Sequence, residues 1–130
     1  MLAIRLVITI LCAVGFYASV FMLRKSLLDA RGLLGEPSVV QSRRANLLAG
    51  LPNALFGCIY YAAVTAAAWL NLRPLLLAAL AAAIAAAAAS AYLGYSLLFV
   101  TRRSCAYCWT AHAVNWLLLA ALVCLVCRWV

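Results

Sequence analysis

Four long apolar stretches dominate this sequence and limit what the chain can fold into. Each is close to the ~20 residues that an α-helix needs to cross the hydrocarbon core of a bilayer. Because no water is available there to bond the backbone, each stretch must satisfy its own N–H and C=O groups as a helix. We therefore predict an all-α membrane protein, a single domain whose four transmembrane helices cover about 2–23, 51–70, 75–100 and 104–129.

The composition excludes the main classes of soluble protein. Hydrophobic residues make up 71% of the 130 residues and charged residues 9%, against roughly half and a quarter in soluble domains. A globular core of this size cannot bury so much apolar surface. A soluble enzyme and a disordered chain are both excluded. The net charge is +8, but the sequence offers no continuous polar surface that could form a basic groove for nucleic acid. We therefore expect membrane lipid, and no nucleic acid, as a partner.

The connections between the predicted helices carry the charge and indicate the orientation. The first, 24–46, is long and polar, whereas 71–74 and 101–104 are tight turns. Basic residues gather at one end of an antiparallel bundle: Arg24, Lys25, Arg31, Arg43, Arg44, Arg102 and Arg103 against Arg5, Arg73 and Arg128. By the positive-inside rule the richer end faces the cytoplasm. We expect a multi-pass protein of the cell membrane whose first and third connections are cytoplasmic.

A Cys-x-x-Cys motif opens the fourth predicted helix. Free N–H groups and the helix dipole at a helix N-terminus stabilise a thiolate on the first cysteine, Cys105. The adjacent Arg102 and Arg103 add positive charge, and Ser104 is a candidate N-cap residue. Cys105 and Cys108 are therefore the predicted catalytic, redox-active pair.

Two further polar residues continue the helix face of this dithiol. At about 100° per residue, Cys105, Cys108, His112 and Asn115 fall within an arc of roughly 80°. A histidine hydrogen-bonded inside a bundle is the ordinary alternative, but polar side chains on an inner face in a membrane are more often functional. A zinc site built on Cys105, Cys108 and His112 lacks the fourth ligand of a closed site, so we expect no metal.

The other cysteines carry weaker signals. Cys12 and Cys58 stand alone in apolar stretches, where cysteine behaves as a small hydrophobe. Cys124 and Cys127 form a second Cys-x-x-Cys, roughly 28 Å from the first by helix rise. A helix C-terminus disfavours a thiolate, so we expect this second pair to be structural.

The start of the second predicted helix carries a possible partner for the dithiol. Asn53, Gly57 and Tyr60 share a helix face, on the membrane side where the fourth helix begins. An amide and a phenol could there face the dithiol across a gap opened by Gly57. A helix-packing notch with a hydrogen-bonded amide is an equally good interpretation.

Several segments resemble the vitamin K epoxide reductase family. NALFGCIYY at 53–61 and CAYCWTAHAVN at 105–115 carry the resemblance, with LCAVG at 11–15 and SAYL at 90–93 in support. The resemblance implies a four-helix bundle that holds a quinone beside the dithiol. It further implies that the second cysteine of the pair exchanges electrons with the quinone, and the first exchanges disulfides with the electron donor.

The same resemblance implies roles for individual residues. Asn53 matches the family's asparagine that hydrogen-bonds a quinone oxygen, and Phe56, Tyr60 and Tyr61 match positions that line the quinone pocket. His112 stands where vertebrate members carry a tyrosine that hydrogen-bonds the quinone, and histidine can donate the same bond. Relatives in bacteria and archaea mostly oxidise thioredoxin-like partners, whereas the vertebrate enzymes reduce vitamin K and its epoxide.

The chain departs from the family's pattern in two ways. The family usually carries a cysteine pair in the first loop that relays electrons, but 24–46 contains none. We therefore expect a thioredoxin-like partner to exchange directly with Cys105. Most prokaryotic members also place the dithiol outside the cytoplasm, whereas the distribution of basic residues here places it inside.

Taken together, these features predict an enzyme. It would be a quinone-dependent thiol–disulfide oxidoreductase that oxidises a thioredoxin-like protein through Cys105 and Cys108 and supports disulfide formation. The electrons would pass to a quinone of the menaquinone, ubiquinone or vitamin K type. One alternative is reduction of vitamin K quinone or its epoxide. Another is a small membrane transporter, although the predicted spans lack the embedded carboxylate that proton-coupled export needs.

Overall fold

The computed structural model describes residues 1–32, 53–101 and 105–129. These residues form four long helices and, within the described ranges, no strand. The helices are α1 (Leu2–Ala30), α2 (Asn53–Leu70), α3 (Arg73–Ser96), continued by the π-helical turn η3 (Leu97–Thr101), and α4 (Ala106–Trp129). All four are long and apolar enough to cross a membrane. The prediction of a four-helix membrane bundle is confirmed.

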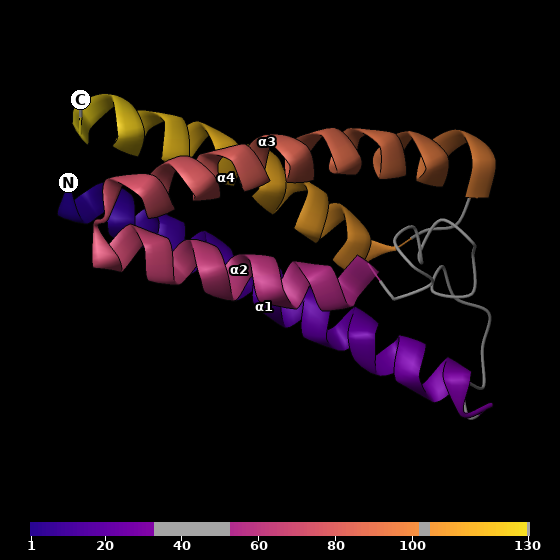
Figure 1. The fold of residues 1–130 in the computed structure, drawn as a ribbon. Helices are drawn as coiled ribbons and strands as arrows, with labels where there is room; N and C mark the ends of the chain where they lie inside the picture. The colour runs from indigo at the N-terminus through magenta and orange to yellow at the C-terminus, as the bar shows by residue number, and fades with distance from the viewer. Residues whose placement is uncertain (33–52, 102–104, 130) are drawn as a thin grey trace.

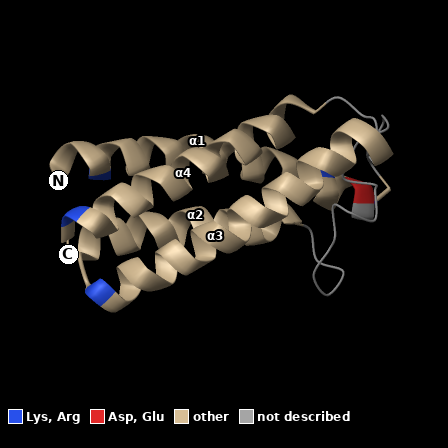
Figure 2. Cartoon of the chain, turned by 90° about the horizontal axis from the view of Figure 1, so that it is seen from above, with Lys and Arg blue, Asp and Glu red and all other residues tan. Residues whose placement is uncertain are grey.

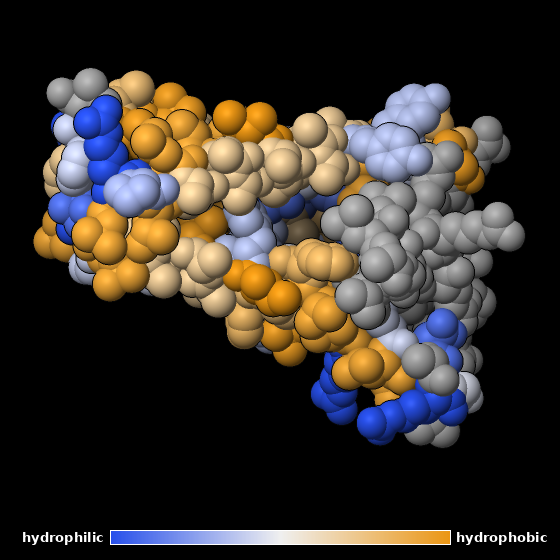
Figure 3. All heavy atoms as spheres, viewed as in Figure 1, coloured by the Kyte–Doolittle hydropathy of each residue, from blue (hydrophilic) through white to orange (hydrophobic). Residues whose placement is uncertain are grey.

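The packing of the bundle is uneven (Figure 1). Helix α1 packs along both α2 and α4, and α4 packs along both α1 and α3. Helices α2 and α3 are joined by a tight turn, yet they contact each other much less than α1 contacts α2 or α3 contacts α4, and they diverge toward the other end. Figure 3 shows a hollow between them, with hydrophilic side chains at its base and apolar surface on both sides. The inner face of α4 is therefore only partly covered by its neighbours.

Each helix turns one apolar face inward and another outward. Leu118, Leu122 and Leu125 of α4 are fully buried and pack in one core cluster with Ile8 of α1 and Val64 of α2. Large apolar side chains cover the outer faces, as lipid contact requires. The described charged residues lie toward the two ends of the bundle (Figure 2).

The helix boundaries correct two of the predicted ones. Helix α1 continues through Arg24 and Lys25 to Ala30, so the first part of the predicted 24–46 loop is helical. Gly32, with a φ of +70°, ends the helix in the left-handed conformation that glycine favours, and its N–H donates to Asp29 O. Helix α3 begins at Arg73, because proline is tolerated in a first helical turn.

Candidate redox site

Cys105 and Cys108 form a disulfide at the N-terminus of α4. Because α4 begins at Ala106, Cys105 takes the N-cap position, and the Cys108 backbone N–H lies 3.2 Å from Cys105 Sγ. The same N–H would hydrogen-bond a Cys105 thiolate once the disulfide opens, and the helix dipole would add to that stabilisation. Ser104, the predicted cap, lies outside the described residues.

The disulfide lies against the last turns of α1. Cys105 Sγ is 3.9 Å from Met22 Sδ, and the Tyr107 ring stacks on Phe21 with 3.9 Å between ring centroids. The Lys25 ammonium lies 5.1 Å from the centroid of the same Phe21 ring. Both cysteines remain half-buried. The first helix was predicted to end at residue 23. The extra turns of α1 beyond that residue therefore start next to the Cys105–Cys108 disulfide.

His112 lies on the inner face of α4, one turn beyond Cys108. Its side chain is buried, at 6% exposure, between the indole rings of Trp109 and Trp116, whose centroids are 5.8 and 6.4 Å away. Among the described residues, His112 Nδ1 has no hydrogen-bond partner. Buried polar atoms in native proteins are nearly always paired. This nitrogen is therefore a place where a ligand oxygen could bind.

A chain of hydrogen bonds crosses three helices beside His112. The Tyr61 hydroxyl on α2 donates to Asn115 Oδ1 on α4 at 2.6 Å, and Asn115 Nδ2 donates to Ser90 Oγ on α3 at 2.6 Å. Tyr61 fits against α1 because Gly15 has no side chain; a Cβ there would lie 2.5 Å from the Tyr61 ring. The chain fixes the inner face of α4 between α2 and α3.

The remaining predicted site residues lie on α2. Asn53 and Phe56 are half-buried in its first turn, at the end of the bundle where α4 begins (Figure 1). The Tyr60 ring lies 5.1 Å from the Tyr61 ring, and its hydroxyl is buried with no partner in the described part of the chain. Tyr61, rather than Tyr60, therefore makes the polar contact with α4.

Gly57 does not open a gap toward the dithiol. A Cβ at Gly57 would lie 2.5 Å from Ser19 Oγ, so this face of α2 packs on α1. At Gly57, therefore, the predicted alternative of a helix-packing notch describes the structure, and the predicted gap facing the dithiol does not.

The other four cysteines are free in the structure. Cys12 is buried and Cys58 half-buried. Cys124 and Cys127 are exposed near the end of α4 that lies away from the disulfide. The described residues contain no cluster of three or more His, Cys, Asp or Glu side chains placed to hold a metal ion.

Some contacts of the site have no clear signal in the sequence. The position of Met22 beside Cys105 and the stacking of Phe21 on Tyr107 depend on how α1 crosses α4. The link from Asn115 to Ser90 depends on the rotation of α3 about its own axis. Ser90 stands in an otherwise alanine-rich stretch, and this was the one sequence feature that indicated a polar contact on α3.

The comparison with protein families agrees with this site. The model of the vitamin K epoxide reductase family matches residues 6–123. That range contains the disulfide, His112 and the Tyr61–Asn115–Ser90 chain, and it ends before Cys124. A comparison with curated proteins gives no match. With four membrane-spanning helices and a match over most of its length, the chain belongs to the vitamin K epoxide reductase family and is a multi-pass membrane oxidoreductase.

Proposed function

We propose that this protein is a quinone-dependent thiol oxidase that takes electrons from a thioredoxin-like partner and so supports protein disulfide formation. The observation that carries the proposal is the placement of two chemistries on one helix. A half-buried disulfide opens α4, and a buried histidine with an unpartnered nitrogen follows one turn later. The first suits exchange with thiols from outside the membrane, and the second suits a polar ligand inside it.

Thiol exchange at this disulfide balances without another cofactor. A partner thiolate attacks Cys105 Sγ, so that a mixed disulfide forms, the Cys105–Cys108 bond breaks, and Cys108 leaves as a thiolate. The partner's second thiolate then attacks its own bound sulfur and closes the partner's disulfide, and Cys105 leaves as a thiolate. The N-cap position of Cys105 favours this second step, because a stabilised thiolate leaves faster. The Cys105 and Cys108 thiolates then take up the two protons that the partner's thiols released, so the dithiol carries two electrons and two protons more than the disulfide.

The residues around His112 fit a quinone. The buried His112 Nδ1 and the Tyr60 hydroxyl lack partners among the described residues, and either could donate to a carbonyl oxygen. Trp109 and Trp116 flank the histidine with aromatic surface that suits a flat ring. A bound quinone would supply the acceptor for the two electrons and two protons of the dithiol. His112 would hold one quinone oxygen, and Asn53 the other, as the family's asparagine does.

The direction of electron flow follows from the order of groups along α4. Cys105 precedes the helix, where a partner protein can reach it, and Cys108 lies one turn from His112. Cys105 therefore exchanges with the partner, and Cys108 passes the electrons inward. Because 24–46 contains no cysteine, the partner meets Cys105 without an intervening relay.

The direct test is quinone-linked thiol oxidation by the purified full chain. Dithiothreitol or a reduced thioredoxin-like protein serves as donor, and quinone reduction is followed by absorbance. We expect C105A and C108A each to fall to the uncatalysed rate, and the matched variants C124A and C127A to retain wild-type rates. Full activity in C108A would refute the mechanism. Turnover of vitamin K epoxide, with no oxidation of a protein donor, would instead assign the alternative reaction.

A further inference from the structure

The end of the bundle away from the disulfide concentrates positive charge. Arg5 of α1, Arg73 of α3 and Arg128 of α4 all lie at this end (Figure 2). Within the described ranges the only acidic side chain is Asp29, near the opposite end of α1. No described carboxylate side chain therefore neutralises these three guanidinium groups, and they form a cationic cluster at one membrane boundary.

A neutral side chain orders part of this cluster. Asn71, in the turn between α2 and α3, accepts two hydrogen bonds on Oδ1: one from Arg5 Nη2 at 2.7 Å and one from the Trp129 indole N–H at 2.6 Å. Asn71 has a φ of +58°, a left-handed conformation that asparagine tolerates better than most residues. Arg5 Nε is buried and has no partner in the described chain. Arg5 and Trp129 are thus held in place, while no acidic side chain among the described residues lies at this end to offset the positive charge.

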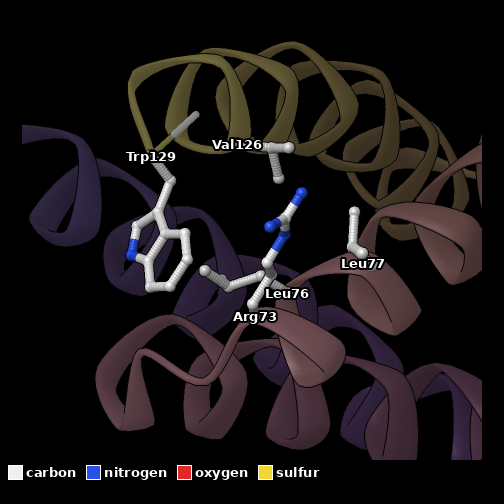
Figure 4. A pocket seen from close by; sticks show the side chains of 5 residues that line it. All are labelled: Arg73, Leu76, Leu77, Val126 and Trp129. Atoms are coloured by element: carbon white, nitrogen blue, oxygen red, sulfur yellow. The ribbon is translucent and has the colours of Figure 1, made fainter.

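Beside Trp129, a pocket opens between α3 and α4 (Figure 4). It is lined by Arg73, Leu76, Leu77, Val126 and Trp129. The Arg73 guanidinium extends between Trp129 and Leu77 toward Val126 (Figure 4). Its walls are otherwise apolar, and Leu77 is 47% exposed on the lipid-facing side. The pocket therefore offers one cation at the mouth of an apolar groove, at the level where the hydrocarbon of a bilayer ends.

We propose that this pocket binds an anionic phospholipid, with Arg73 holding the phosphate and Leu77 and Val126 contacting the upper part of an acyl chain. The charge of Arg73 selects the headgroup, because its guanidinium attracts the net negative charge of an anionic lipid and would repel the cationic group of a zwitterionic one. Tryptophan is favoured at this depth, where one side of the ring is apolar and the other wet. This site is independent of the thiol chemistry at the opposite end of the bundle.

The test measures lipid preference at Trp129 in the full chain. A variant with Trp129 as its sole tryptophan (W69F, W109F and W116F) is reconstituted in phosphatidylcholine bilayers. Phosphatidylglycerol or phosphatidylcholine with dibrominated chains is added at equal mole fractions, and quenching of the emission gives the ratio of their local binding constants. We expect phosphatidylglycerol to be preferred about fivefold, the factor that corresponds to about 1 kcal/mol per basic residue near an anionic lipid.

Three variants and one competitor decide the outcome. In R73Q the ratio should fall close to one. It should persist in R73K, which keeps the charge, and in R24Q, which removes a charge at the other end of the bundle. Glycerol phosphate in the buffer should not compete. A ratio of one in the parent protein, or an unchanged ratio in R73Q, would overturn the proposal. Competition by glycerol phosphate would show a site for free phosphate and would overturn the assignment to lipid.

Discussion

The Tyr61 hydroxyl donates a 2.6 Å hydrogen bond to Asn115 Oδ1 and so joins α2 to α4 beside His112. Through Ser90 the same amide joins α4 to α3. Helices α2 and α3 contact each other little, so these two bonds form a polar link between the walls of the hollow in Figure 3. Asn115 therefore sets the spacing of the helices around the proposed quinone site.

Replacing Asn115 by leucine should destabilise the protein and weaken quinone binding. The substitution keeps the side-chain volume but leaves the Tyr61 hydroxyl only its longer, 3.4 Å bond to the Ala111 carbonyl and removes the Asn115 amide from Ser90 Oγ. An unsatisfied buried polar group costs about 1–3 kcal/mol. We expect a lower free energy of unfolding by circular dichroism and a higher KM for quinone. T110V, at an exposed position of α4, is the control and should behave like wild type.

A double-mutant cycle separates this bond from general damage. Y61F and N115L should be strongly non-additive, because the second substitution removes a bond that the first has already broken. Additive losses in the free energy of unfolding would show that the two side chains are not coupled.

Gly15 should tolerate no side chain. A Cβ at Gly15 would lie 2.5 to 2.9 Å from atoms of the Tyr61 ring, and the hydrogen bond to Asn115 prevents the ring from moving aside. We expect G15A to cost about 1–3 kcal/mol in unfolding free energy, the usual range for an overpacked core. G94A is the matched control, because its Cβ would lie 3.5 Å from the Trp109 ring, an ordinary contact. Equal stability of the two variants would contradict this packing.

His112 should affect the quinone half of the reaction and leave the thiol half unchanged. H112F keeps an aromatic ring between Trp109 and Trp116 but removes Nδ1. Since a hydrogen bond contributes about 0.5–1.5 kcal/mol net, kcat/KM for quinone should fall roughly 2- to 10-fold. The rate at which a thiol donor reduces the disulfide, measured in a single turnover without quinone, should stay the same. If H112F slowed the thiol step and left the quinone kinetics normal, His112 would not be part of the proposed quinone site.

The orientation of the dithiol is open to a labelling experiment. In a variant that keeps only Cys105 and Cys108, we expect a membrane-impermeant maleimide to label the reduced pair after permeabilisation and not in intact cells. The expectation rests on the excess of basic residues at that end, of which Arg24, Lys25 and Arg31 lie in the described chain. Labelling in intact cells would place the dithiol outside the cytoplasm.

Sequence reasoning worked where one helix alone determines the geometry. The spacing of Cys108 and His112 places them on one face of α4, with Cys105 at its N-cap, regardless of what packs there. It failed at the end of α1, because hydropathy marks where the apolar part of a segment ends, and Arg24 and Lys25 are good helix formers that continue the helix.

Contacts between helices could not be predicted from the sequence. Gly57 could be placed on a face of α2, but its neighbour, Ser19 of α1, depends on how the two helices rotate and cross. The link from Tyr61 through Asn115 to Ser90 requires three helices to be in register at once. No periodicity within one segment carries that information.

The most direct measurement of the central claim is a single anaerobic turnover of the reduced protein. Protein with Cys105 and Cys108 as thiols is mixed with a quinone, quenched in acid and alkylated, and the peptide that carries both cysteines is analysed by mass spectrometry. The account predicts one Cys105–Cys108 disulfide formed for each quinone reduced, and none without quinone. Quinone reduced while both thiols remain free, or a disulfide formed equally fast in its absence, would contradict it.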